Sequence, residues 1–187
     1  MDIDWEDIQA CLRGEDEAYS RIIRRHESVI ATQMRRFANT SADREDLVQE
    51  VFVEAFFSLP RYQPQAPFLH WLRKIATHVG YQYWRKNARR PNTVQLQEHD
   101  SQQAGEEEQR LDPEQAELLL KKMLARLSPA DRTIMTLMYF DNCALSEISE
   151  RTGWNRTVIK MRAYRARKKL RKIAQEEKLL EKLSWMS

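Results

Sequence analysis

The side chains best suited to chemistry in this sequence are cations gathered in one stretch. Ten lysines and arginines, and no acidic residue, lie between Arg151 and Lys172. Small and aliphatic residues recur within this stretch at helical spacing, namely Ile159, Ala163, Ala166 and Leu170. A helix that buries those residues presents its cations outward, and this pattern favours binding to nucleic acid. The alternative is an amphipathic helix whose cationic side is only solvated.

A break precedes this predicted helix. Thr152-Gly153-Trp154-Asn155 separates it from a shorter helical pattern that begins near Glu147. Two helices around such a break form the outline of a helix-turn-helix, in which the second helix enters the major groove of duplex DNA. We call the residues expected to contact DNA the cationic face: Arg156, Lys160, Met161, Tyr164, Arg165, Arg167 and Lys168.

A second group combines aromatic, cationic and amide side chains. Residues 58–67 contain three prolines and predict a stiff loop, followed by a helix from about Phe68 to Asn87. Bases stack on aromatic rings, phosphates meet Lys and Arg, and amides read base edges, so this group suits single-stranded nucleic acid. The alternative is that Trp71 belongs to the core and the others are solvated. We call this group the aromatic stripe: Arg61, Tyr62, Gln63, Trp71, Lys74, His78, Gln82 and Arg85.

A third group is acidic. Asp46, Glu50 and Glu54 recur four residues apart on one predicted helix, where like charges repel by a few tenths of a kcal/mol per pair. Apolar Val53 and Phe57 lie beside them, which is typical of a surface that meets a partner. A solvated acidic helix side is the alternative. We call Asp46, Gln49, Glu50, Val53 and Glu54 the acidic face.

The remaining sequence argues against an enzyme. CxxC, HExxH, glycine-rich phosphate-loop and GxSxG motifs are absent, and the four histidines lack metal-ligand spacing, so we expect no catalytic residue, metal or cofactor. Cys11 and Cys143 are isolated, which favours reduced thiols. The acidic N-terminus has no apolar signal region and no apolar run is long enough to span a bilayer. We therefore expect a cytoplasmic protein without membrane insertion.

Composition and charge predict an all-α protein of two small domains. Only four glycines occur in 187 residues, which disfavours a turn-rich β fold. Net charge is +1 over residues 1–91, −7 over 92–117 and +9 over 118–187. We expect a first domain at 1–91, an acidic flexible linker at 92–112, and a second domain with a C-terminal tail at 113–187.

Local signals place the helices. Two helices are expected within residues 3–38, separated at Arg13–Asp16, and a capping box at Thr40–Asp43 starts the next. Helix starts are also expected at Asp112-Pro113 and at Ser128–Asp131, where a capping residue is followed by proline. The apolar face expected on the third helix consists of Leu47, Val48, Val51, Phe52, Ala55 and Phe56. The second core is expected from Ile134, Leu137, Met138 and Ile148.

Several blocks of the sequence resemble the sigma-70 family of RNA polymerase initiation factors. Asp46–Phe52 and Phe68–Ala76 resemble its region 2. Four later segments resemble its region 4: Leu127–Arg132, Glu147–Ser149, Thr157–Lys160 and Arg165–Leu170. Region 3 is replaced by the acidic segment, as in the short extracytoplasmic-function (ECF) sigma factors.

The resemblance implies a role for each group. The acidic face matches the helix that docks on the β′ clamp helices of core polymerase, and the β flap is a further core contact. The aromatic stripe matches the loop and helix that capture unstacked bases of the promoter −10 element, and the cationic face matches the helix that reads the −35 element. An anti-sigma factor is an implied partner, and its sequestration of the protein at the membrane is implied as well.

Two other functional classes remain open from the residues alone. A stand-alone helix-turn-helix regulator would bind duplex DNA without polymerase, which leaves the acidic face and the aromatic stripe without a role. A helical adaptor would make no salt-sensitive contact with DNA.

Overall fold

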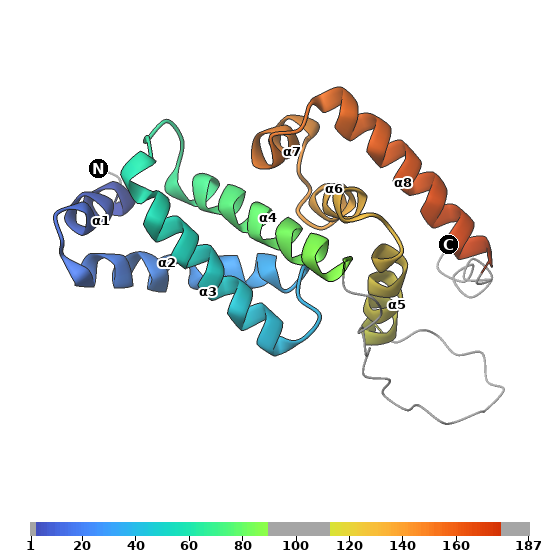
Figure 1. Ribbon diagram of the computed structural model, residues 1–187, viewed down its shortest axis with the longest axis horizontal. Coiled ribbons are helices and arrows are strands. Elements are labelled where there is room, and N and C mark those ends of the chain that lie inside the picture. Colours follow the sequence, from blue (N-terminus) through green and yellow to red (C-terminus); the bar gives the residue numbers. More distant parts are fainter. Residues whose placement is uncertain (1–2, 90–112, 177–187) are drawn as a thin grey trace.

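The computed structural model describes residues 3–89 and 113–176, all of whose regular elements are helical. The first four helices form one group and the last four form a second group beside it (Figure 1). The first group comprises α1 (Ile3–Leu12), α2 (Asp16–Met34), α3 (Ser41–Ser58), the 3-10 turn η1 (Leu59–Arg61) and α4 (Phe68–Asn87). The second comprises α5 (Pro113–Ala125), α6 (Pro129–Tyr139), α7 (Leu145–Thr152) and α8 (Arg156–Glu176).

Helix starts in the first domain follow the local signals. Gly14 has a φ of +92° between α1 and α2, a conformation that glycine adopts without strain. The Thr40 hydroxyl accepts from the Asp43 amide and the Asp43 carboxylate accepts from the Thr40 amide, so the predicted capping box starts α3. Between α3 and α4 the proline-rich segment forms η1 and a loop, so part of the predicted loop is a single helical turn.

The first core lies where α2, α3 and α4 pack together. Its largest fully buried side chains include Phe37, Phe68, Ile22, Ile30 and Leu72. The apolar face predicted on α3 is buried from Leu47 to Ala55, but Phe56 is 46% exposed and lies at its edge. The expectation that Phe56 belongs to the buried face was therefore wrong, since its ring only meets the Tyr19 ring of α2 edge-on at 4.9 Å and stays partly exposed.

The second domain has the predicted helix-turn-helix. The Ser128 hydroxyl accepts from the Asp131 amide at the start of α6, whereas Ala144 gives α7 no side-chain cap. Gly153 ends α7 with a φ of +73°, the left-handed conformation common at helix C-termini. Ile134, Leu137 and Ile148 form the second core with Ile159 and Ala163 of α8, and Met138 packs at its side.

The two domains are in contact through α4, which packs on both α6 and α7. The Arg132 guanidinium lies over the Trp84 ring at 4.0 Å from its centroid, and the Tyr81 and Trp154 rings meet edge-on at 5.4 Å. Asp141, in the loop after α6, forms an ion pair with Arg36, which follows the end of α2. The proposed linker (92–112), the cap residue Asp112 and the tail beyond Glu176 lie outside the described residues.

Candidate nucleic-acid and protein interfaces

All five residues of the acidic face are exposed on α3. The structure therefore brings them together as predicted, with the carboxylates of Asp46, Glu50 and Glu54 on solvent. Val53 is 54% exposed and Phe57, one turn further on, is 75% exposed. Both apolar side chains lie uncovered next to the acidic residues.

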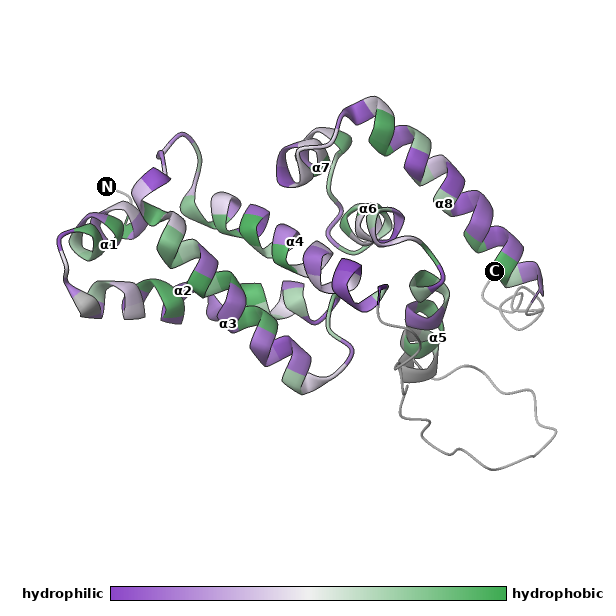
Figure 2. Ribbon diagram, viewed as in Figure 1, coloured by the Kyte–Doolittle hydropathy of each residue, from purple (hydrophilic) through white to green (hydrophobic). Residues whose placement is uncertain are grey.

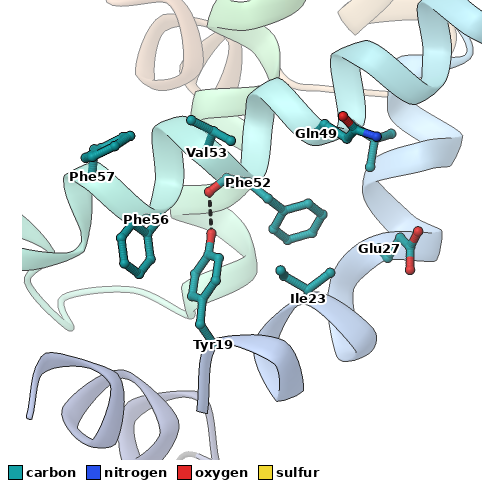
Figure 3. A pocket seen from close by; sticks show the side chains of 9 residues that line it. Tyr19, Ile23, Glu27, Gln49, Phe52, Val53, Phe56 and Phe57 are labelled. Atoms are coloured by element: carbon teal, nitrogen blue, oxygen red, sulfur yellow. Dashed lines mark hydrogen bonds between the residues drawn. The ribbon is translucent and has the colours of Figure 1, made fainter. Parts of the chain in front are cut away.

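The α2–α3 groove is an apolar depression beside this face. Its volume is about 560 Å³. In Figure 3, Tyr19, Ile23 and Glu27 of α2 face Phe52 and Phe56 of α3. The Tyr19 hydroxyl donates to the carbonyl of Phe52, which links the two sides of the groove, and burial raises the pKa of Tyr19. Val48, Gln49, Val53 and Phe57 complete the lining.

Sequence patterning missed this groove. The i, i+4 spacing of α3 marks which residues share a face, but the groove is lined by side chains of both α2 and α3. Its sequence signal was the apolar pair Val53 and Phe57 beside the acidic residues, since both side chains line the groove.

The structure divides the aromatic stripe. Trp71 is half-buried and packs on the rings of Tyr62 and Phe68, at 5.1 and 5.3 Å between centroids. Tyr62 itself is only 9% exposed, and its hydroxyl donates to the carbonyl of Ala66. The expectation of an accessible Tyr62 was wrong, because the loop folds back and packs this ring beside α4.

The rest of the stripe faces solvent to differing extents. Arg61 and Gln63 are exposed on the loop, and Lys74, His78 and Arg85 are exposed along α4. Gln82 is partly exposed, and its amide nitrogen lies 3.4 Å from Nε2 of His78.

The cationic face lies on the side of α8 that points away from the second core. Six of its members are exposed, and Arg167 is partly covered with Nη1 3.4 Å from the Tyr139 hydroxyl. Apolar Met161 and Tyr164 are 49% and 61% exposed, among cations. Figure 2 shows that hydrophilic residues cover most of α8.

Two arginines of the acid-free run are engaged within the protein. Arg151 is 4% exposed and pairs with Glu147, one turn earlier on α7. Arg162 Nη1 donates to Asp131 at 2.9 Å. An acid-free sequence window therefore overstates the outward charge, because acids from α6 and α7 fold against it.

The described residues hold no cluster of His, Cys, Asp or Glu suited to a metal ion. Cys11 is partly buried and Cys143 is buried. Within residues 3–89 and 113–176, none of the helices is long and apolar enough to cross a membrane.

Comparison with known families agrees with this arrangement. Residues 22–90 match the model of sigma-70 region 2, and residues 117–170 match that of sigma-70 region 4. The first match contains α3, α4 and the loop between them, and the second contains the helix-turn-helix. The chain therefore belongs to the sigma-70 family, in its ECF group.

Curated relatives carry the same description. The ECF RNA polymerase sigma-E factor of Haemophilus influenzae is 22% identical over 169 residues, which cover 86% of this chain and 89% of that protein. Sigma-E of Escherichia coli K12 is 23% identical with 86% and 88% coverage. The sigma factor CarQ of Myxococcus xanthus is 26% identical over 166 residues, with 89% and 94% coverage.

A solved structure shares the fold. CnrH, in complex with the cytosolic domain of CnrY, matches with a TM-score of 0.61 and 22% identity over 94% of this chain and 99% of that one. As a sigma factor, the protein is a transcription initiation factor and not an enzyme.

Proposed function

We propose that the protein recruits core RNA polymerase through the acidic face and positions it at promoters by two DNA contacts. The cationic face binds duplex −35 DNA, and the exposed part of the aromatic stripe holds the opened −10 strand. The observation that carries this proposal is the distribution of the three groups over two domains, with acidic residues on α3 and the cationic face on α8.

Docking on polymerase fits the chemistry of α3. A basic partner surface relieves the repulsion among Asp46, Glu50 and Glu54. The adjacent groove then accepts apolar side chains from that surface, with Phe57 as an anchor, because aromatic residues dominate the binding energy of interfaces. We assign this surface to the β′ clamp helices and leave the β flap as a contact of the second domain.

Strand capture uses the loop and α4. Arg61 and Gln63 offer a cation and an amide on the loop, while Lys74 and Arg85 line α4 for phosphates. Tyr62 and Trp71 shape the base of this surface, since their rings pack on each other. The opening of DNA then follows from differential binding, because the contacts form only with an unstacked strand.

Duplex recognition uses α8. Arg165 and Lys160 reach phosphates or base edges, and Tyr164 and Met161 offer apolar contact to thymine methyl groups. The domain limits proposed for these roles are 1–91 and 113–187, joined through 92–112.

A regulatory partner is part of the proposal. The similar CnrH structure contains the cytosolic domain of another protein, CnrY. We infer that this cytoplasmic protein also binds a protein partner, an anti-sigma factor that sequesters it at the membrane.

The decisive experiment is transcription by purified core polymerase on genomic promoter fragments, with and without the protein. Glu50→Lys should weaken core binding and leave binding of a −35 duplex intact, and Arg165→Ala should do the reverse. Tight duplex binding without any stimulation of core polymerase would instead identify a stand-alone helix-turn-helix regulator. An identical defect in both variants would show that the two faces are assigned wrongly.

A further inference from the structure

The strand-capture loop, residues 61–67, lies beside a helix to which the proposed function gives no role. Helix α1 precedes residues 22–90, the part of the chain that matches region 2. It nevertheless packs against the 3-10 turn η1, in which the loop begins. Figure 1 shows α1 and this loop at the same end of the first domain. The contact therefore joins a helix outside the family match to the loop proposed to hold the −10 strand.

Tyr62 is the anchor of this loop. Its ring meets Phe68 at 5.4 Å and Trp71 at 5.1 Å between centroids, and only 9% of the residue is exposed. Its amide donates to the carbonyl of Leu59, and its hydroxyl donates to the carbonyl of Ala66. Hydrogen bonds thus hold both ends of the loop around one buried ring.

The inward position of this ring decides where its neighbours lie. Arg61 and Gln63 flank Tyr62 in the chain, and both are exposed. These are the two loop residues proposed to meet the opened strand. A loop that lost its anchor would hold this cation and this amide in many arrangements, and strand binding would then have to order them. The packing of Tyr62 is thus a determinant of strand capture.

Trp5 of α1 forms one wall of the site in which the Tyr62 ring lies. The two rings are tilted by 51° with their centroids 6.3 Å apart, within the range of attractive aromatic pairs. Phe68 and Trp71 belong to α4, so Trp5 meets Tyr62 from a different helix. Trp5 is itself partly buried and packs against the first core. The position of α1 therefore contributes directly to the shape of the loop.

Charged side chains hold this part of α1 in place. Asp4 accepts from Arg25 Nη1 at 2.5 Å and lies 2.9 Å from His26 Nε2. Asp7 accepts from Arg25 Nη2 at 2.7 Å. The side chains of Asp4 and Asp7 are only 14% and 8% exposed, so solvent screens these ion pairs weakly. The two carboxylates lie on either side of Trp5 in the chain and fix the helical turn that carries it.

We propose that Trp5 is a positioning residue for strand capture: α1 holds its ring against Tyr62 and thereby presents Arg61 and Gln63 to the opened strand. The consequence for DNA rests on the proposed function, because only a strand-binding loop needs this order. The packing itself is a property of the free protein and can be measured without polymerase or DNA.

Limited digestion by trypsin measures the order of the loop. The bond after Arg61 joins it to Tyr62, whose amide is held by Leu59, so cleavage requires local opening. Trp5→Leu should accelerate cleavage at this bond by roughly two- to tenfold, the factor that one aromatic pair contributes to an opening equilibrium. Trp5→Phe, which keeps a ring, should be cleaved more slowly than Trp5→Leu. Cleavage after exposed Arg126 in the second domain is the internal reference and should not change.

Two further variants separate loop order from lost stability. Ile30→Val removes a buried methylene group of α2 from the same core. It should lower the stability of the first domain without faster cleavage after Arg61 under native conditions. Asp4→Asn weakens the attachment of α1 and should accelerate that cleavage, because Trp5 then loses its support.

Strand binding tests the consequence for function. The probe is a fluorescent single-stranded oligonucleotide that carries the −10 element of a promoter transcribed by the protein, titrated against the complex with core polymerase. Trp5→Leu should weaken its binding by about two- to tenfold, while the affinities for core and for a −35 duplex stay the same. Because Trp5 acts through the loop, Arg61→Ala should lose less affinity in the Trp5→Leu background than in the unaltered chain.

The digestion results can overturn the positioning role without any DNA. Unchanged cleavage after Arg61 in Trp5→Leu would show that Trp5 does not order the loop. Unchanged cleavage in Asp4→Asn would show that the ion pairs of α1 do not support it. Equal acceleration in Ile30→Val would show that cleavage follows global stability.

The binding results can overturn it as well. Faster cleavage with unchanged strand binding would show that loop order does not govern capture, and an equal loss of core affinity would show that Trp5→Leu disturbs the whole domain. Failure of the proposed function gives a different result. The unaltered complex would then bind no −10 strand, while the digestion pattern would still report whether Trp5 orders the loop.

Discussion

Gly80 on α4 lies directly against the ring of Phe37. A Cβ atom at position 80 would be 2.3 Å from Cδ1 of that ring, closer than real side chains approach. The same ring packs on Trp84 at 4.4 Å between centroids, and the Trp84 indole nitrogen donates to the Phe37 carbonyl at 2.8 Å. A glycine in the middle of a long helix thus allows the segment after α2 to pack on the helix that meets the second domain.

The first prediction concerns Gly80→Ala. The added methyl group forces the Phe37 ring out of place, which should lower the free energy of unfolding by about 1–3 kcal/mol despite the better helix propensity of alanine. Urea unfolding monitored by circular dichroism measures this loss. Phe37→Leu combined with Gly80→Ala should lose less than the sum of the two single variants, because leucine vacates the contested volume. Strict additivity would show that the two residues are not in steric contact.

The second prediction concerns buried Asp7 on α1. It accepts from Arg21 Nε and Arg25 Nη2, each at 2.7 Å. Burial opposes ionisation, but the two arginines prevail and hold the pKa of Asp7 below its ordinary 3.8. The stabilisation is therefore present above pH 3.8 and lost as pH falls through the lower folded-state value.

Asp7→Asn should accordingly cost about 1.5–3 kcal/mol at pH 7, the usual contribution of hydrogen bonds to a charged group. The difference from the parent protein should shrink in acid. Thermal unfolding from pH 7 to pH 3 measures both, and Glu6→Gln, an exposed neighbour on α1, is the matched control. A pH-independent difference would mean that Asp7 acts through shape and not charge.

The third prediction concerns Phe57, the most exposed aromatic residue beside the α2–α3 groove. Phe57→Ala should weaken binding to core polymerase about tenfold, or ~1.4 kcal/mol, because it removes the proposed apolar anchor. Stability should change little, since the ring is 75% exposed. Fluorescence titration against core measures the affinity, and Leu12→Ala on α1, 46% exposed, should bind normally. Equal affinities of these two variants would remove Phe57 from the interface.

The fourth prediction compares two arginines on α8. Arg165 is exposed within the cationic face, whereas Arg162 donates to Asp131. Arg165→Gln should weaken binding to a −35 duplex and, if it meets a phosphate, reduce the slope of log affinity against log salt by about 1. Arg162→Gln should leave that slope unchanged and lower stability instead. Fluorescence anisotropy across a salt series distinguishes them, and a reversed result would place the DNA on another side of α8.

Local patterns in the sequence were enough to locate the helices. The capping box at Thr40, the cap at Ser128 and the break around Gly153 act within a few residues, so their structural consequences could be predicted without knowledge of the fold. Exposure of the acidic face on α3 followed from the 3.6-residue period for the same reason.

Contacts between distant residues could not be read in this way. Tyr62 and Arg151 are residue types that often bind nucleic acid. In the fold, however, the Tyr62 ring packs on Trp71 and the Arg151 side chain pairs with Glu147. Whether a side chain is buried depends on which element packs over it, and that is decided by the summed packing of the whole chain.

The sequence by itself therefore determined the helical elements, the separation of charge and the faces on which acids and cations gather, because these depend on short-range periodicity. Only the tertiary structure decided that α2 and α3 form an apolar groove and that Arg132 lies on Trp84 of the other domain. Residues 84 and 132 are brought together by the packing of α4 on α6 and α7, which is a long-range balance of burial, charge and shape that no local pattern contains.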